Sequence, residues 1–415
     1  MEKVIDIAKK ARQASREMIF LSTYTKNQIL QAMADELRNN FQQIIEANSL
    51  DVKKSQDEKT SAALIDRLTL DKNRINSMAQ GLEIVKDLAD PIGEIIEGYK
   101  RPNGLEILSK RVPLGVVGII YEARPNVTVD AIGLCLKTSN AVILRGSSSA
   151  INSNKKIVEL LIAAGKKLGL PENAISLIED TDRESVNELI KLNGLIDVVI
   201  PRGGAGLINN VVQNATVPTI ETGVGNCHVY IDEDADFAKA KSIIINAKIS
   251  RPSVCNAAET LLVHQNFPLQ YFQDILAELI NLKVQLRGCS ITNKVNPNVK
   301  LASEEDYSTE FLDYILAVKV VASIEEAIEH IHKYGTKHTE AIVTENYSQA
   351  NLFTQHVDAA AVMVNASTRF TDGFEFGFGA EIGISTQKLH ARGPMGLKAI
   401  TTNKYVVNGN GQVRI

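Results

Sequence analysis

The stretch that decides the fold begins with GVVGII (residues 115–120) and continues with AVILRG (141–146), AISLIE (174–179), LIDVVIP (195–201) and VPTIE (217–221). Each run is short and almost wholly apolar, which is typical of strands buried on both faces of a parallel sheet. Helical segments such as residues 150–168 separate the runs, so strands and helices alternate along the chain. This alternation predicts a doubly wound, nucleotide-type sheet of the α/β class.

Two of these strands end in segments that suit a phosphate. RGSSS (145–149) closes the second run, and PRGGAG (201–206) closes the fourth. Ligands of doubly wound sheets bind at the carboxyl ends of the strands, where glycines allow close approach and the next helix offers its N-terminus. One glycine-rich turn can serve chain geometry alone, whereas two in consecutive units favour a cofactor site. The serines beside Arg145 replace the acidic residue that grips a free ribose hydroxyl, which favours a cofactor with a 2′-phosphate.

A second segment, KISRPSVCNAAETLLVH (248–264), carries the candidate nucleophile. A helical pattern over residues 237–249 stops before Pro252, and a strand rich in leucine and β-branched residues begins near Thr260. Cys255 therefore falls in a short turn, among small neighbours that leave a thiol open to a substrate. A buried structural cysteine is the alternative for any lone thiol, and the motifs along the rest of the chain decide between the two.

The segment after Cys255 predicts a second α/β domain. A capping box at residues 323–326 fixes the start of one of its helices. Glycine is dense over residues 373–396, among Arg369, Lys388 and Arg392, and these cations favour an anion-binding loop set over a flexible linker. The predicted strands are 258–264, 314–321, 340–344 and 360–365, and the predicted helices are 269–282, 323–334 and 348–357.

The two ends of the chain differ from this α/β pattern. Apolar residues recur at helical spacing in the first hundred residues, which predicts helices there. Residues 94–111 read as a β-hairpin with its turn at Asn103-Gly104, and residues 399–409 read as a strand with no helix after it. We expect both segments to pair outside the two α/β domains.

Composition excludes several classes of protein. With 415 residues the chain should form two or three domains, and its net charge of −4, without any basic block, argues against nucleic acid as the main partner. The apolar runs are short and the first residues form a charged amphipathic pattern, which predicts a soluble cytoplasmic protein without membrane contact. The four cysteines and seven histidines lack metal or disulfide spacing, so no metal is expected.

Three motifs, YEARPN (121–126), RPSVCNAAE (251–259) and HARGPMG (390–396), identify a family. They occur in an order and context that resembles the aldehyde dehydrogenase superfamily over essentially the whole chain. The resemblance implies a Rossmann-type cofactor domain (1–97 and 117–226), an α/β catalytic domain (227–395) and a small β oligomerisation element (98–116 and 396–415).

The resemblance also implies roles for individual residues. Cys255 is the nucleophile, Asn126 the oxyanion donor and Glu310 the contact to the nicotinamide ribose. Glu221 matches the general base of hydrolytic relatives, although a structural glutamate in a turn is the alternative. Further cofactor contacts are expected from Arg145, Ser147, Ser148, Arg202, Gly203 and Gly204. The arginines expected near the substrate's phosphate and carboxylate are Arg124, Arg251, Arg369 and Arg392.

The cofactor implied by the resemblance is NADPH. Relatives carry a lysine in place of Arg145 and, where they prefer NAD, a glutamate near Ser147 and Ser148. Both departures in this chain favour a 2′-phosphate.

The activity implied is reduction of L-glutamate 5-phosphate to L-glutamate 5-semialdehyde and phosphate through a cysteine thioester. This reaction is the second step of proline biosynthesis from glutamate, and its product cyclises to 1-pyrroline-5-carboxylate. A homo-oligomer, at least a homodimer, and functional coupling to glutamate 5-kinase are expected. Two alternatives stay open: a dehydrogenase that hydrolyses its thioester with water, and a catalytically silent nucleotide-binding scaffold.

Overall fold

The computed structural model describes residues 3–414, apart from the side chains of residues 62 and 63. The chain divides into two compact units. Unit 1 comprises the described residues of Met1–Thr222, Gly377–Gly383 and Met395–Ile415, and unit 2 comprises Gly223–Phe376 and Ile384–Pro394.

Unit 1 begins with helices, as the helical spacing predicted. Leu30, Met33 and Leu37 form the fully buried face of α2, and Ile75 and Leu82 lie on the buried face of α5. Side chains at the N-caps, Ser22 and Asp71, accept backbone hydrogen bonds and fix where α2 and α5 start. The helices are α1(Val4–Met18), α2(Thr23–Asn39), α3(Phe41–Asp57), α4(Ala62–Leu68) and α5(Lys72–Asp87).

A parallel sheet of strand order β5-β4-β3-β6 forms the centre of unit 1. Every residue of β3 and β4 is buried, which confirms the interpretation of the apolar runs. Its elements are β3(Val116–Tyr121), α6(Pro125–Lys137), β4(Ala141–Gly146), α7(Ile151–Lys166), β5(Ile175–Leu177), α8(Arg183–Leu189), β6(Val198–Arg202) and α9(Ala205–Asn214).

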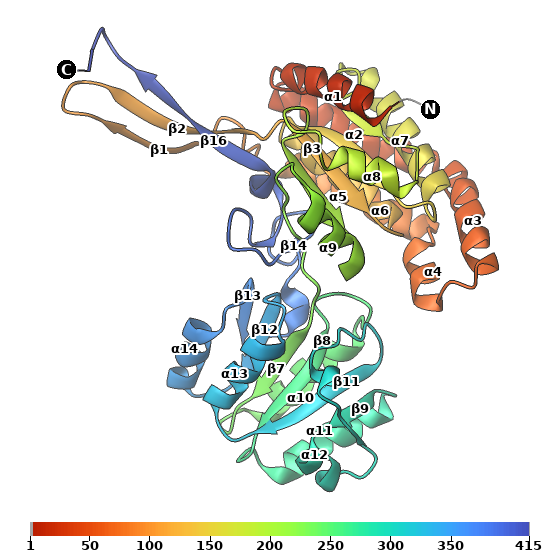
Figure 1. The fold of residues 1–415 in the computed structure, drawn as a ribbon, viewed down its shortest axis with the longest axis vertical. Coiled ribbons are helices and arrows are strands. Elements are labelled where there is room, and N and C mark those ends of the chain that lie inside the picture. Colours follow the sequence, from red (N-terminus) through yellow and green to blue (C-terminus); the bar gives the residue numbers. More distant parts are fainter. Residues whose placement is uncertain (1–2, 415) are drawn as a thin grey trace. The chain divides into compact units, whose positions relative to one another are not determined.

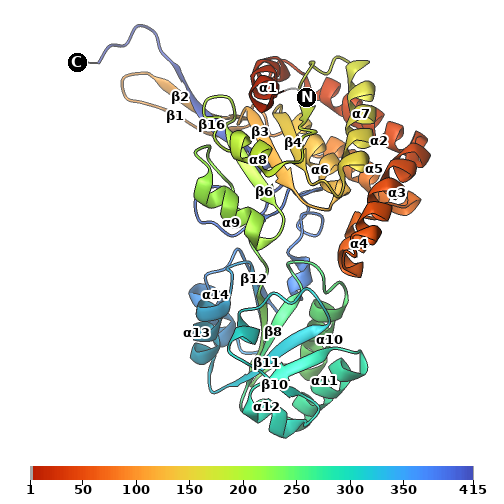
Figure 2. The same ribbon diagram turned by 45° about the vertical axis from the view of Figure 1, so that its right-hand side comes forward.

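Helices cover both faces of this sheet. Residues of α1, α8 and α9 share one apolar core with β3, β4 and β6. The helices α2, α5, α6 and α7 pack together, and Figure 2 shows them gathered on the opposite side from α8 and α9.

The prediction of a strand over residues 217–221 was wrong. Thr219 forms an isolated bridge to Val199 beside β6, and no regular strand is present in this described segment. Pro218 explains the difference, because it accepts a hydrogen bond from the Val199 amide but has no amide of its own to extend the ladder.

The predicted hairpin and tail strand form one antiparallel sheet of order β1-β2-β16, which extends away from the helices of unit 1 (Figure 1). Its strands are β1(Ile95–Lys100), β2(Glu106–Pro113) and β16(Thr401–Asn408). Gly104 closes the hairpin turn with a positive φ of 90°, and its amide donates to the Arg101 carbonyl (2.9 Å). Both sequence predictions for this region are confirmed.

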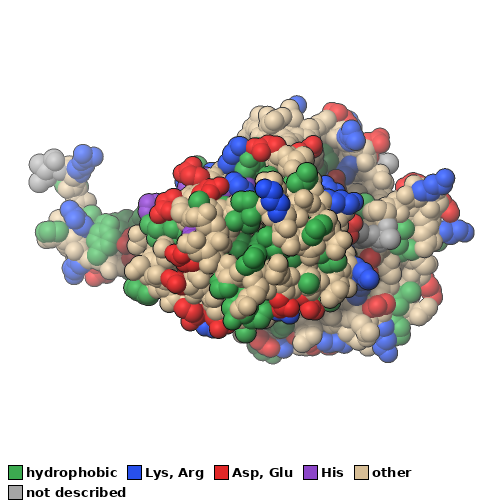
Figure 3. All heavy atoms as spheres, turned by 90° about the horizontal axis from the view of Figure 1, so that it is seen from below, with side chains coloured by type: hydrophobic (Ala, Val, Ile, Leu, Met, Phe, Trp, Pro, Cys, Tyr) green, Lys and Arg blue, Asp and Glu red, His purple; other side chains and the backbone are tan. Residues whose placement is uncertain are grey.

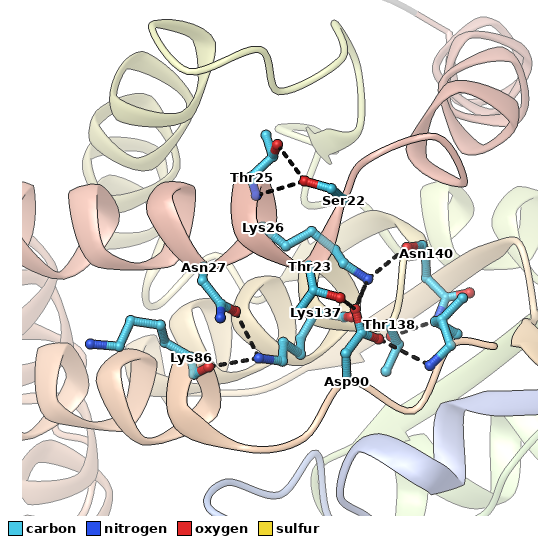
Figure 4. Close-up of polar contacts among 12 residues, drawn as sticks. Ser22, Thr23, Thr25, Lys26, Asn27, Lys86, Asp90, Lys137, Thr138 and Asn140 are labelled. Atoms are coloured by element: carbon cyan, nitrogen blue, oxygen red, sulfur yellow. Dashed lines mark hydrogen bonds and ion pairs between the residues drawn. The ribbon is translucent and has the colours of Figure 1, made fainter. Parts of the chain in front are cut away.

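A buried polar corner supports the base of this sheet (Figure 4). Lys26 from α2 pairs with Asp90, which precedes β1, and donates to the backbone carbonyl of Lys137 in α6 (3.0 Å). Asn140 connects the corner to the end of the chain, because its Nδ2 donates to the Ile400 carbonyl (2.9 Å) directly before β16. The corner therefore connects α2 and α6 to the start of both outer strands, β1 and β16, of the three-stranded sheet.

Unit 2 contains a parallel sheet of order β10-β9-β11-β8-β7-β12-β13, which confirms the second α/β domain. α10 and α11 share one apolar core with the central strands, and α13 and α14 share another. The strands are β7(Cys227–Ile231), β8(Ala258–His264), β9(Gln285–Gly288), β10(Lys300–Leu301), β11(Ile315–Val321), β12(Thr339–Val343) and β13(Ala361–Val364). The helices are α10(Phe237–Ile249), α11(Leu269–Asn281), α12(Ser290–Val295), α13(Ile324–Tyr334) and α14(Tyr347–His356).

The capping box in unit 2 forms with one changed partner. Ser323 accepts from the Glu326 amide (3.4 Å), so α13 starts where the sequence predicted. The Glu326 carboxylate accepts from the amide of Ala322 (2.7 Å), one residue before the cap.

Short elements complete the chain. They are three 3₁₀ turns, η1(Glu305–Tyr307), η2(Thr368–Phe370) and η3(Leu397–Ile400), and an antiparallel pair, β14(Ile384–Ser385) and β15(Gly393–Pro394), within the glycine-rich segment of the described chain.

Charges are mixed on the face of the molecule shown in Figure 3, where acidic and basic side chains are interspersed. A continuous basic field, which nucleic acid binding requires, is not formed by the described residues drawn there. Within residues 3–414, no helix has the length and apolar character needed to cross a membrane.

Candidate active site

Cys255 lies in the turn between α10 and β8 and is partly exposed, as the sequence predicted. The residue after it fixes the turn. Asn256 is buried, its Nδ2 donates to the Thr371 carbonyl (3.0 Å), and its own carbonyl accepts from the Thr368 hydroxyl (2.7 Å). The nucleophile candidate is therefore held on a rigid turn, which suits a group that must meet a substrate in one orientation.

Cys227, the first residue of β7, and Gly225, two residues before it, both contact the backbone of Cys255. The buried Cys227 thiol donates to the Cys255 carbonyl (3.1 Å), and burial raises the pKa of Cys227 well above its usual value, so this thiol keeps its proton. A Cβ on Gly225 would lie 1.6 Å from the same carbonyl oxygen, so only glycine fits there. The conformation of the turn thus depends on Cys227 and Gly225, which act through packing and a hydrogen bond and not as reactive groups.

Glu310 is also engaged with this segment. Its Oε1 accepts from the Gly225 amide (2.8 Å). The carboxylate predicted to contact the nicotinamide ribose therefore also holds the glycine that packs on Cys255.

A fully buried ion pair flanks the turn. Lys248, near the end of α10, lies 2.6 Å from Glu259 at the start of β8, and both side chains are 0% exposed. The other oxygen of Glu259 accepts from the Leu312 amide (3.1 Å), in the loop that carries Glu310. Burial raises the pKa of Glu259 to about 7, against the opposing effect of the Lys248 ammonium. The pair joins both ends of the Cys255 turn and connects it to a third segment.

The predicted substrate arginines of unit 2 differ in how they are engaged. Arg369 donates to the Ser250 hydroxyl (2.9 Å) and to the side-chain oxygen of Asn256, so it supports the turn, and burial lowers its pKa. Arg392 donates to Asp358 (2.7 Å), whose pKa it and Lys388 lower to about 2. Arg251 is exposed and makes no hydrogen bond or ion pair with residues 3–414.

In unit 1, a cavity of about 600 Å³ lies at the carboxyl ends of β3, β4 and β6. Of the predicted cofactor residues, four line it: Arg145, Ser147, Ser148 and Gly204. Arg183 and Glu122 also line it and were not predicted, because sequence alone did not indicate which loops approach the glycine-rich turn. The position agrees with the general rule for ligands of doubly wound sheets.

Two of the predicted groups in this cavity already have partners within unit 1. The Arg145 guanidinium donates to the carbonyls of Thr181 (2.6 Å) and Asp182 (2.9 Å). The Gly204 amide donates to the Glu122 carboxylate (2.9 Å). A Cβ on Gly203 would lie 2.4 Å from the same carboxylate, so the approach of Glu122 explains this glycine without any phosphate.

The remaining predicted residues of unit 1 lie apart from the cavity lining. Arg124 is the N-cap of α6, and the exposed Asn126 donates to Asp130 (3.2 Å) one turn later. Arg202 ends β6, and Glu221 is half-buried beside Thr222, whose hydroxyl donates to the Pro201 carbonyl (2.7 Å).

Comparison with known proteins shows which proteins this chain is similar to. The model of the aldehyde dehydrogenase family matches residues 1–297. A gamma-glutamyl phosphate reductase from Caldanaerobacter subterraneus is 60% identical over 407 residues, which cover 98% of each chain. One from Thermoanaerobacter pseudethanolicus is 59% identical over the same share of both chains. The crystal structure of gamma-glutamyl phosphate reductase from Thermotoga maritima covers 100% of both chains, with 50% identity and a TM-score of 0.96.

Proposed function

The chain belongs to the aldehyde dehydrogenase family, and we propose that it reduces L-glutamate 5-phosphate to L-glutamate 5-semialdehyde and inorganic phosphate with NADPH. The observation that carries the proposal is the partly exposed thiol of Cys255 on a turn fixed by hydrogen bonds on both sides. The name shared by relatives that match nearly the full length supplies the substrate. The reaction is the second step of proline biosynthesis from glutamate, and its product closes to 1-pyrroline-5-carboxylate.

The chemistry assigned to Cys255 has three parts. Its thiolate attacks the acyl carbon, an S–C bond forms, the C–O bond to the phosphate breaks, and inorganic phosphate leaves. When bound, the nicotinamide cofactor supplies a hydride for reduction of the resulting thioester. Cys255 then leaves as a thiolate and the aldehyde is released, so one residue serves as both nucleophile and leaving group.

NADPH binding is assigned to the cavity of unit 1, because its size and its place at the carboxyl ends of parallel strands suit a nucleotide. Ser147 and Ser148 offer hydroxyl donors, and the glycine turn at Gly204 allows close backbone approach. Asn126 is proposed as the oxyanion donor. Glu221 needs no role as a base here, because the reaction does not use water. Phosphate is the leaving group in the reductive direction and the attacking group in the oxidative direction.

The anionic ends of the substrate need cations. Arg251 is the strongest candidate in unit 2, because its guanidinium is exposed and not engaged by residues 3–414. Arg124, Arg369 and Arg392 remain candidates, although Arg369 and Arg392 would have to share their donors with the protein.

The decisive experiment follows the reaction in the oxidative direction. The full-length protein is incubated with glutamate 5-semialdehyde and NADP⁺, with and without inorganic phosphate, and NADPH formation is recorded. We expect turnover that requires phosphate. Turnover without phosphate would instead identify a hydrolytic dehydrogenase, and binding of NADPH without any turnover would identify a nucleotide-binding scaffold.

A homodimer built on the three-stranded sheet is proposed as the assembly. β1 is exposed along its length and forms an open edge of this sheet, and Ile95, Ile96 and Tyr99 expose about half of their surface. Such an edge with apolar side chains suits pairing with a second copy. Deleting the residues after Thr402 removes most of β16 and should weaken association. Light scattering measures the number of copies in the assembly, and a truncated protein that remains a dimer would contradict the proposal.

We place the reaction in the cytoplasm and in functional coupling with glutamate 5-kinase. An acyl phosphate is reactive toward water, so its consumption close to where it is made protects it. A lower yield of semialdehyde when the two enzymes are separated by a membrane would support the coupling.

A further inference from the structure

The cavity of unit 1 contains two arginines in opposite circumstances, Arg145 and Arg183. Either of them could recognise the 2′-phosphate of NADPH, a role that rests on the proposed function. Arginine is suited to this task because its planar guanidinium offers paired donors to a phosphate. A guanidinium can serve only if its donors are not already engaged.

Arg145 is engaged by the protein. It is 7% exposed, and each of its three side-chain nitrogens donates a hydrogen bond within unit 1. The partners are the Ser185 hydroxyl (3.2 Å), the Gly146 carbonyl (3.3 Å) and the Thr181 and Asp182 carbonyls. To bind a phosphate through both terminal nitrogens, Arg145 would have to release the segment 181–185 and lose its bonds to two part-buried carbonyls.

Arg183 lies in the segment that Arg145 holds. It is the first residue of α8, it is exposed, and it makes no hydrogen bond or ion pair with the described part of the chain. The exposed Ser148, two residues after β4, lines the same cavity and offers a hydroxyl. Arg145 therefore positions a loop whose own arginine has all of its donors available.

The charge distribution of the cavity points the same way. Glu122 is the one carboxylate among its lining residues, and it is bound to the Gly204 amide from the loop after β6. A phosphate beside Glu122 would be repelled, whereas one beside Arg183 would be attracted. We propose that Arg183, with Ser148 as a second donor, binds the 2′-phosphate, and that Arg145 is a positioning residue for the segment 181–185.

The test compares Arg183→Ala with Lys191→Ala, an exposed cation of unit 1 outside the cavity lining. For Arg183→Ala we expect the KM for NADP⁺ to rise about 10- to 100-fold, with the KM for NAD⁺ and kcat nearly unchanged. Arg183→Lys should restore part of the loss, and Lys191→Ala should match the unaltered protein. Equal increases for both cofactors, or no increase, would overturn the assignment.

A binding measurement separates this inference from the proposed activity. Calorimetry with adenosine 2′,5′-bisphosphate and with 5′-AMP needs no turnover. Arg183→Ala should weaken the first ligand by a similar factor and leave the second unchanged. Arg145→Lys should lower Tm and weaken both ligands alike; selective loss of the bisphosphate in that variant, with Tm unchanged, would return the role to Arg145. Failure of the phosphate-dependent assay, by contrast, would refute the activity without bearing on these ratios.

Discussion

The Cys255 turn of unit 2 and the strand-end loops of unit 1 use polar residues for opposite purposes. Around Cys255, the buried groups Asn256, Cys227 and the Lys248–Glu259 pair all hold the backbone, and the thiol itself stays accessible. In unit 1, by contrast, Arg145 was predicted to bind a ligand, but its guanidinium donates hydrogen bonds to the neighbouring loop of the protein. A residue type at a strand end therefore predicts where a site lies, and only its partners decide whether it serves the ligand.

The largest effect is expected on turnover, when the Cys255 thiol is replaced. Cys255→Ser should lower phosphate-dependent turnover on the order of a thousandfold or more, because a serine hydroxyl near neutral pH is protonated and weakly nucleophilic. NADPH binding should be retained. Cys135→Ala, in α6 of unit 1, is the matched control and should keep most of its activity. Substantial turnover by the serine variant would remove Cys255 from the mechanism.

The next effect is on stability and concerns the buried pair. Lys248→Met leaves Glu259 buried without its cation and should lower the free energy of unfolding by about 3–5 kcal/mol. The double variant Lys248→Met with Glu259→Leu should recover much of that loss, since neither charge is then buried. Urea unfolding measures both; a single variant as stable as the parent would show that the pair does not support the turn.

The pH dependence of the Lys248→Met penalty follows from Glu259. Burial already raises its folded-state pKa to about 7, and loss of the ammonium raises it further. Between the ordinary pKa of a glutamate and its folded-state pKa, Glu259 is ionised in the unfolded chain and protonated in the folded one, so stability falls as pH rises. In the parent this fall ends near pH 7, whereas in Lys248→Met it continues to higher pH. The difference between Lys248→Met and the parent should therefore be larger at pH 8 than at pH 5.

A pair of glycine substitutions compares the two regions directly. Gly225→Ala would force a methyl group to within 1.6 Å of the Cys255 carbonyl, so the turn must move, and a displacement near 1 Å can lower turnover about 100-fold. In Gly204→Ala the new Cβ lies 3.8 Å from Glu122, an ordinary contact. The rate of alkylation of Cys255 by iodoacetamide should change in Gly225→Ala only. Equal changes in both variants would show that the Cys255 turn is no more sensitive to its own glycine than to one in unit 1.

The smallest effect is expected at Glu122. Glu122→Gln keeps an oxygen that can accept from the Gly204 amide, and the site is exposed, so stability should change by less than about 0.5 kcal/mol. Urea unfolding of Glu122→Gln and of Lys248→Met compares the two losses in the free energy of unfolding. A loss as large as that of the buried pair would mean that both regions depend equally on their carboxylates.

Much of the fold could be predicted because its signals are local. Apolar runs gave β3 and β4, a proline after a helical pattern ended α10, and Asn103-Gly104 placed the hairpin turn. The strand at 217–221 failed because Pro218 removes a donor that hydrophobicity does not reveal. Local pattern therefore predicts which segments are buried better than it predicts which of them complete a ladder.

The candidate site could be predicted in position but not in partners. Cys255 was placed by its turn, whereas the bond from Cys227 to its carbonyl joins segments 28 residues apart that no spacing rule connects. Arg183 was missed for the same reason, since tertiary packing places it in the same cavity lining as Ser148. Contacts of this kind arise from tertiary packing, which a single sequence leaves open.

The bond from Asn140 to the Ile400 carbonyl has a consequence for how the chain is made. β2 precedes unit 2 in the chain, yet β16, which pairs with β2 over its full length, follows unit 2. On the ribosome, β2 therefore presents an open edge while all of unit 2 is being produced. A nascent chain that stalls before residue 400 exposes a template for pairing with other chains, so chaperones that shield strand edges should act on this protein until β16 emerges.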